Sequence, residues 1–301
     1  MSAAPARELR VKRLKNLRYR LRRHAAAYVK LLGAGFGPDR ILPDFLIIGA
    51  MKSGTSSLFH TLQQHPGIAS PSTKEIHFLD NPVFYRFGEA WYRSHFPTRR
   101  AMAALSNRLG YRAVSGEGTP AMISNFYAVN AARHLPHARL IAVLRNPVDR
   151  AYSHYHHMRR SIFGEPLSFW DALQSEQSRT AHDMSLNRTA PDMAGKEHKR
   201  YTYTQRGMYI DQLENWLRYF PRDQLRLFHY DSLVSDPGHL CNQVTRFLGL
   251  PAHTFDIGER HNTGHYTEPM DERCREYLTE LFRPYNRRLF EFLGEDWGWP
   301  A

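Results

Sequence analysis

The pattern of apolar and polar positions along the chain predicts a layered α/β domain. Four consecutive apolar residues at 45–48 predict a short buried strand, and Leu58 and Leu62 mark the amphipathic helix that follows it. Two more buried strands are predicted over 138–144 and 225–228. Because strands alternate with helices, we expect a three-layer, P-loop-like fold in which helices flank a central parallel sheet.

Weaker patterns complete the expected order of elements. Short strands are expected over 68–70 and at the start of 112–120, while 82–109 is expected to be irregular to helical. Pro147 suits the first turn of a helix. Residues 180–200 are polar and predict a mobile surface loop. Helices are predicted over 125–134, from 147 onward, over 206–220, 237–248, 269–282 and 284–293.

The loop after the first strand has the composition of an anion site. Gly49 ends the strand and Gly54 precedes the helix, whose unpaired N–H groups and dipole attract negative charge. The spacing resembles the nucleotide P-loop, but the lysine stands three residues earlier, at Lys52, where it suits a shorter anionic chain than a triphosphate. An ordinary βα turn is the alternative. Hydroxyl groups add further donors at Ser53, Thr55, Ser56 and Ser57.

A second candidate phosphate contact follows the strand at 138–144. Arg145 stands at the carboxyl end of this strand, where open α/β sheets bind their ligands. Ser153 lies eight residues further on, so a guanidinium and a hydroxyl can share one phosphate. Alone, an arginine before Asn-Pro is more often a cap or surface residue. The neighbouring glycine loop favours the phosphate interpretation.

Two titratable residues of the segment 74–80 are candidates for proton transfer. Glu75 and His77 lie two residues apart, on one side of an extended segment, and either can accept a proton from a substrate hydroxyl. A surface glutamate and a structurally bonded histidine are the alternative. The histidines of 154–157 do not predict a metal site, because they lack an i, i+4 pair and nearby cysteines. We therefore expect no metal.

Composition and charge divide the chain into two parts. The 301 residues are 42% hydrophobic and include two cysteines, with no apolar run of membrane-spanning length, which predicts a cytoplasmic globular protein. Residues 1–40 carry a net charge of +9 out of the formal +12. We expect a basic helical arm over 1–40 and one domain over 41–301. Residues 7–32 suit an anionic membrane surface or another polyanion, or form a solvated arm.

The motifs together resemble the PAPS-dependent sulfotransferases. The run 48–58 is similar to their 5′-phosphosulfate loop, and 144–153 is similar to their 3′-phosphate motif. The segment 74–80 resembles the catalytic segment of the heparan sulfate glucosaminyl sulfotransferase branch, in a bacterial form. The similarity extends over about residues 43–296.

The resemblance implies a role for each candidate residue. Lys52 would stabilise the leaving phosphate oxygen, and Lys52 to Ser57 would hold the 5′-phosphosulfate of PAPS. Arg145 and Ser153 would bind the 3′-phosphate. Glu75 would be the general base, with His77 as its orienter or as a substitute base. The expected reaction is transfer of a sulfuryl group to a hydroxyl or amine of a carbohydrate or other small acceptor, without nucleic acid as a partner.

Departures from the family pattern leave the acceptor open. Gly118 stands where the family usually has a lysine, and the late cofactor loop has Thr263-Gly264 in place of Lys-Gly. Thr263 and Gly264 are nevertheless the expected cofactor contacts there. Two other functions remain as alternatives, a P-loop-type kinase or ATPase and a non-catalytic polyanion-binding protein that acts through 7–32.

Overall fold

A five-stranded parallel sheet forms the centre of the molecule. The computed structural model describes residues 25, 29, 39–124, 127–161, 164–189, 200–257 and 268–301, without the side chains of 183–189. Each strand pairs in parallel with its neighbour. In sheet order the strands are β2 (Ile68–Ala69), β3 (Val114–Glu117), β1 (Phe45–Gly49), β4 (Arg139–Leu144) and β5 (Leu225–His229).

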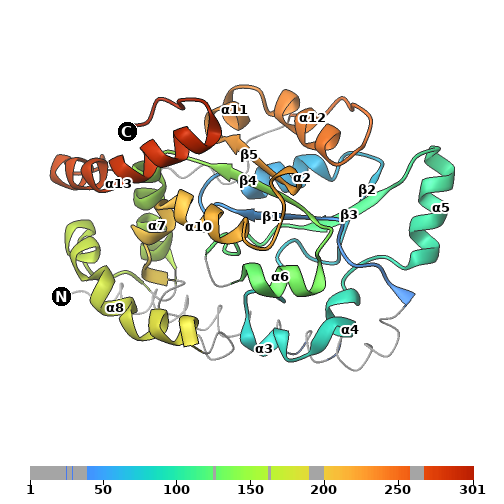
Figure 1. The fold of residues 1–301 in the computed structure, drawn as a ribbon, viewed down its shortest axis with the longest axis horizontal. Helices are drawn as coiled ribbons and strands as arrows, with labels where there is room; N and C mark the ends of the chain where they lie inside the picture. Colours follow the sequence, from blue (N-terminus) through green and yellow to red (C-terminus); the bar gives the residue numbers. More distant parts are fainter. Residues whose placement is uncertain are drawn as a thin grey trace, which may run out of the picture.

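Helices cover both faces of the sheet, because successive residues of each buried strand point to opposite sides (Figure 1). Phe45 and Ile47 pack on one side, and Leu46 and Ile48 pack on the other. The first face is covered by α2 (Thr55–Leu62), α11 (Tyr230–Ser235) and α12 (Pro237–Phe247). The second is covered by α4 (Gly88–Arg93), α6 (Ala128–His134), α10 (Tyr209–Trp216) and α13 (Glu272–Leu293).

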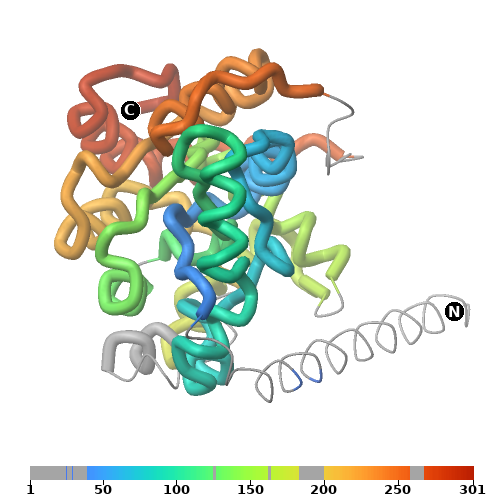
Figure 2. Tube along the Cα trace, turned by 90° about the vertical axis from the view of Figure 1, so that its right-hand side faces the viewer, coloured from blue at the N-terminus to red at the C-terminus, as the bar shows by residue number. Residues whose placement is uncertain are grey.

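Peripheral helices extend the core at the two ends of the sheet. Figure 2, together with Figure 1, shows α5 (Arg99–Leu109) as the outermost element beside β2, with the short α3 (Pro82–Tyr85) in the layer of α4. At the opposite end, a third apolar cluster joins α7 (Pro147–Arg160), α8 (Phe169–Thr189) and α13. The predicted fold class, a parallel sheet flanked by helices, is confirmed.

Four predicted elements were wrong in extent. The predicted loop 180–200 is helical as far as Thr189, and 190–199 lie outside the described residues. The predicted helix 206–220 is split into a 3₁₀ turn, Gln205–Gly207, and α10, because Met208 has non-helical dihedrals (φ −78°, ψ 65°). The helices predicted over 269–282 and 284–293 are the single helix α13, which contains Pro284.

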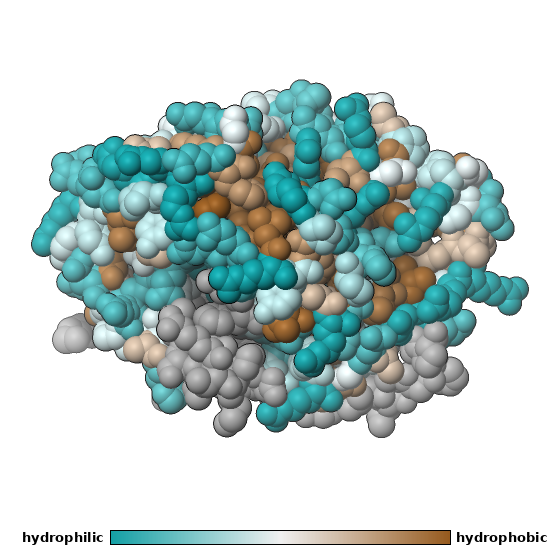
Figure 3. Space-filling view, viewed as in Figure 1, coloured by the Kyte–Doolittle hydropathy of each residue, from teal (hydrophilic) through white to brown (hydrophobic). Residues whose placement is uncertain are grey.

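The surface and the cysteines add little that points to a function. On the face in Figure 3, hydrophobic residues gather near the middle, with hydrophilic residues above and beside them. Cys241 and Cys274 are free and buried. In the part of the chain that the structure describes, no helix is long and apolar enough to cross a membrane.

Candidate active site

The candidate residues gather at the carboxyl edge of the sheet. The loop 50–54 leaves the end of β1, Arg145 follows β4, and Glu117 ends β3. Because β1 lies between β3 and β4, these three groups emerge side by side. Ligands of parallel α/β sheets bind at this edge.

The loop between β1 and α2 exposes the start of the helix. Gly54 caps α2 in the left-handed region (φ 76°), and a Cβ there would come within 2.7 Å of Leu233 Cδ2, so the position requires glycine. Lys52 also has a positive φ of 75°, which is uncommon for a residue with a side chain. The pKa of Lys52 is lowered by burial and then by the nearby cations Arg160 and Arg145. Several positive groups therefore converge on this loop, as an anion site requires.

Arg145 joins the second predicted phosphate motif to the first. Its Nη1 lies 3.5 Å from the carbonyl oxygen of Lys52, and its guanidinium lies 5.0 Å from the centre of the Tyr230 ring. The Tyr209 hydroxyl donates a 2.9 Å hydrogen bond to the carbonyl oxygen of Arg145. Ser153 is buried within α7, the helix that begins just after Arg145. These contacts fix the predicted 3′-phosphate motif beside the loop.

The segment 74–80 forms a chain of charged contacts against the same loop. The Lys74 ammonium donates to Ser56 Oγ at 3.0 Å and to Glu75 Oε1 at 2.9 Å. Glu75 Oε2 lies 3.4 Å from His77 Nε2, and His77 Nδ1 lies 3.0 Å from Asp80 Oδ1. Burial alone would raise the pKa of Glu75, but His77 and Lys74 outweigh it and hold the pKa at about 2. The carboxylate is thus ionised at neutral pH, with one edge toward the imidazole.

Glu117 holds the segment 74–80 through a hydrogen bond to its backbone. Its side chain is fully buried, and its carboxyl oxygens accept hydrogen bonds from the Ile76 N–H (3.2 Å), the Tyr92 hydroxyl (2.6 Å) and the Thr119 hydroxyl (2.7 Å). Burial raises the pKa of Glu117, and these hydrogen bonds oppose the shift. The end of β3 thereby positions the backbone between Glu75 and His77.

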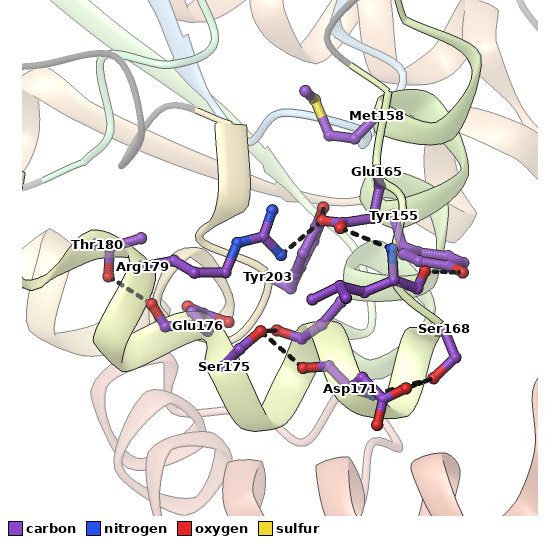
Figure 4. A network of polar contacts seen from close by, with 12 residues as sticks. Tyr155, Met158, Glu165, Ser168, Asp171, Ser175, Glu176, Arg179, Thr180 and Tyr203 are labelled. Atoms are coloured by element: carbon purple, nitrogen blue, oxygen red, sulfur yellow. Dashed lines mark hydrogen bonds and ion pairs between the residues drawn. The ribbon is translucent and has the colours of Figure 1, made fainter.

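Figure 4 shows a buried polar network that holds the segment 203–205, which precedes α10. Glu165 accepts hydrogen bonds from Arg179 (2.9 Å) and from the Tyr203 hydroxyl (2.6 Å). Glu176 accepts the backbone N–H groups of the two residues after Tyr203, and Arg150 donates to the Tyr203 carbonyl oxygen. The network ties α8 and α7 to the turn that leads into α10, the helix that bears Tyr209.

The structure brings most of the predicted site residues together. Lys52 to Ser57, Arg145, Glu75 and His77 lie at one edge of the sheet, and the Lys74 contacts join the predicted catalytic segment to the predicted phosphate loop. Thr263 and Gly264 lie outside the described residues. Gly118 stands where the family usually has a lysine, and its N–H donates a hydrogen bond to the Lys74 carbonyl oxygen. Among the described residues, no group of three or more metal-binding side chains occurs.

Sequence reasoning missed three residues that organise the site. Asp80 lies three residues after His77, and the sequence alone gave it no role. Glu117 could have been found as an acidic residue within a buried strand. The hydrogen bond of Tyr209 to residue 145 spans 64 positions, so no local pattern predicts it. Left-handed backbone at His77 (φ 59°), as at Lys52, is visible only in the structure.

The parallel sheet flanked by helices, with the candidate residues at its carboxyl edge, defines an α/β fold of the P-loop-like type. Comparison with known families makes the assignment specific, because the Sulfotransferase domain model matches residues 42–280. The chain therefore belongs to the sulfotransferase family, and its class is that of the PAPS-dependent sulfotransferases.

Similar proteins agree with this family. The chain is 29% identical to heparan sulfate glucosamine 3-O-sulfotransferase 6 of Homo sapiens, over 89% of this chain and 76% of that protein. It is 26% identical to the membrane-associated sulfotransferase kil1 of Dictyostelium discoideum, over 86% of this chain and 66% of that protein. A sulfotransferase structure from Alicyclobacillus acidocaldarius has a TM-score of 0.63 at 30% identity, over 85% of this chain and 97% of that one.

The relatives are not all of the same length as this chain. It spans only 26% of the bifunctional heparan sulfate N-deacetylase/N-sulfotransferase of Drosophila melanogaster, to which it is 32% identical.

Proposed function

We propose that this protein transfers a sulfuryl group from PAPS to a hydroxyl or amine of a carbohydrate. One observation carries the proposal, namely that the Lys74 ammonium contacts both Ser56 of the phosphate loop and Glu75 of the catalytic segment. A carboxylate is thereby placed directly beside a loop suited to bind an anion. Proton transfer and sulfuryl transfer need that proximity.

The described residues fit the donor. The loop Lys52 to Ser57 offers N–H groups, hydroxyls and an ammonium to the 5′-phosphosulfate, while Arg145 and Ser153 offer a guanidinium and a hydroxyl to the 3′-phosphate. PAPS supplies the activated sulfuryl group. We assign Thr263 and Gly264 to the same donor site by the family resemblance alone.

The chain's own residues then have separate tasks. Glu75 takes the proton of the acceptor hydroxyl as the acceptor oxygen bonds to sulfur. The bond from sulfur to the 5′-phosphate oxygen breaks, and Lys52 stabilises the charge that develops on that oxygen. His77, held by Asp80, orients Glu75 through its Nε2. PAP leaves with the electrons of the broken bond.

Binding of PAP, the desulfated donor, tests the donor assignment. We would compare PAP, 5′-AMP and ATP by calorimetry on the wild type and on Arg145→Ala, with Arg226→Ala as the matched control because Arg226 is exposed on β5. PAP should bind more tightly than AMP, and only Arg145→Ala should remove that preference. Equal binding of PAP and AMP would contradict the assignment, and a preference for ATP with Mg²⁺ would favour a kinase or ATPase.

The carbohydrate acceptor is proposed from the relatives that are named for heparan sulfate. Radiolabelled PAPS should transfer its sulfuryl group to glucosaminyl oligosaccharides in preference to simple phenols. Transfer to phenols alone would contradict a carbohydrate acceptor. An Arg145→Ala control shows whether the labelled product depends on the donor site.

We also propose that the basic arm over 1–40 is separate from the domain over 41–301 and contacts an anionic membrane from the cytoplasm. The net charge of +9 on the arm supports this. Phosphatidylserine vesicles should retain the full chain and should fail to retain a variant with Arg18, Arg22 and Arg23 changed to glutamate. Equal retention would contradict the proposal, and retention on RNA would favour a polyanion-binding function.

A further inference from the structure

Lys74 lies between the loop Lys52 to Ser57, which we assign to the donor and call the donor loop, and the carboxylate of Glu75, which we assign as the base. Its ammonium is 3.0 Å from Ser56 Oγ and 2.9 Å from Glu75 Oε1, and its side chain is only 12% exposed. A single cation therefore contacts both halves of the site. The reaction described above leaves this residue without a task.

The backbone keeps Lys74 in this position. The Gly118 N–H donates a 3.1 Å hydrogen bond to the Lys74 carbonyl oxygen. A Cβ at Gly118 would stand 3.4 Å from Lys74 Cε, so the lysine stem lies against the glycine at the end of β3. The lysine stem is thus held at the end of β3, with its ammonium within hydrogen-bond distance of both Ser56 and Glu75.

Glu75 has few other cationic partners. Its second oxygen faces His77 at 3.4 Å, and His77 is itself bonded to Asp80. Across the site, His157 of α7 is close enough to Glu75 to interact electrostatically, and His157 also lies near Lys52. A carboxylate with an ammonium partner accepts protons poorly, because the ion pair favours the charged form.

We propose that Lys74 couples donor binding to the release of the base. In the donor-free protein the ammonium holds Glu75, and when a sulfuryl group occupies the loop beside Ser56 the ammonium turns to the sulfuryl oxygens. Glu75 then loses its closest cation and becomes free to accept the acceptor's proton. Lys74 is a positioning residue in this scheme, and the inference rests on the proposed function.

The physical basis is competition between two anions for one cation. The sulfuryl oxygens and the Glu75 carboxylate cannot both hold the same ammonium at full strength. The competition has a signature that a structural role would not produce, because removal of Glu75 should strengthen binding of PAPS. PAP lacks the sulfuryl group and should be indifferent to both residues.

The test compares the affinities of PAPS and PAP by calorimetry, at low temperature and without acceptor. Lys74→Met should weaken PAPS binding about tenfold, the value of one charge-assisted hydrogen bond, and should change PAP binding by less than about twofold. Glu75→Gln should strengthen PAPS binding, and the gain should vanish in the double variant that also carries Lys74→Met. Lys74→Arg, which keeps the charge, should retain most of the PAPS affinity.

Other outcomes separate the inference from the proposed function. If Lys74→Met weakens PAPS and PAP equally, or if Glu75→Gln leaves PAPS binding unchanged, the coupling is refuted while the donor assignment stands. If the wild type binds neither ligand, the proposed function itself fails. Circular dichroism and unchanged PAP binding show that a variant is folded, so a weakened PAPS complex cannot be attributed to misfolding.

Discussion

At the scale of single residues, Lys52 has the most direct role in the reaction that we propose. The backbone of Lys52 lies in the left-handed region, and its ammonium lies close enough to the Arg145 guanidinium to interact with it electrostatically. Lys52→Met should lower kcat, measured as the rate of PAP production, by a factor of roughly 10²–10³. This is the loss expected when a preorganised electrostatic donor is removed. Arg226→Ala is the control, and a loss below about tenfold would mean that another cation stabilises the leaving group.

The identity of the base can be read from the acid side of the pH profile. A pKa of about 2 leaves Glu75 ionised throughout the working range of the free protein. The kcat/KM for PAPS, which reports free-enzyme groups, should therefore stay level from about pH 7 to about pH 5. If His77 were the base instead, the same quantity would fall toward acid pH, because a protonated imidazole cannot accept the proton of the acceptor.

Motifs along the chain predicted the candidate residues, but the contacts between distant residues could not be predicted from the sequence. Lys52 stands out in a glycine loop and Arg145 at the end of a predicted strand, while Glu75 and His77 stand out as two titratable residues of the segment 74–80. Glu117 differs, because its three hydrogen bonds depend on how β3 passes beneath the segment 74–80. That arrangement follows from the sheet order, which no local pattern encodes.

At the scale of elements, the end of β3 controls the placement of the catalytic segment. Glu117→Ala should lower the free energy of unfolding by about 2–4 kcal/mol, because the Ile76 N–H and the Tyr92 hydroxyl would lose a buried acceptor. Glu117→Gln should cost less, since an amide keeps one acceptor oxygen and avoids burying a charge. Urea unfolding measures both, and an alanine variant as stable as wild type would show that the network contributes nothing.

The same scale explains which elements were misjudged. A break was predicted between 282 and 284, next to Pro284, and proline inside a helix removes one hydrogen bond at a cost of about 3 kcal/mol. Helix α13 nevertheless continues, because Leu278, Phe282 and Leu289 bury one continuous apolar face on both sides of the proline. The helix predicted over 206–220 is interrupted instead. Gly207 lies so close to Phe282 that a Cβ on this glycine would come within 2.6 Å of the ring, and the chain forms a 3₁₀ turn at this point.

At the scale of the whole molecule, the donor site lies where three parts of the core meet. The loop 50–54 and Arg145 leave the central strands β1 and β4, whose opposite sides belong to the two large apolar clusters. The third cluster, around α7, contacts the same edge through the helix that bears Ser153. We therefore expect ligand binding at this edge to be linked to unfolding of the entire domain.

Saturation with PAP should accordingly stabilise the whole molecule. At about 100 times its Kd, a ligand that binds only the native state adds about 2.7 kcal/mol, which corresponds to a rise in Tm of about 4 °C for a chain of this size. Differential scanning calorimetry on the wild type should show this rise, and Arg145→Ala should lose it. Added salt should shrink the rise, because the interaction joins cations to a polyanion at a partly exposed edge. If 5′-AMP at the same concentration produced an equal rise that Arg145→Ala left intact, the 3′-phosphate would not be what the edge recognises.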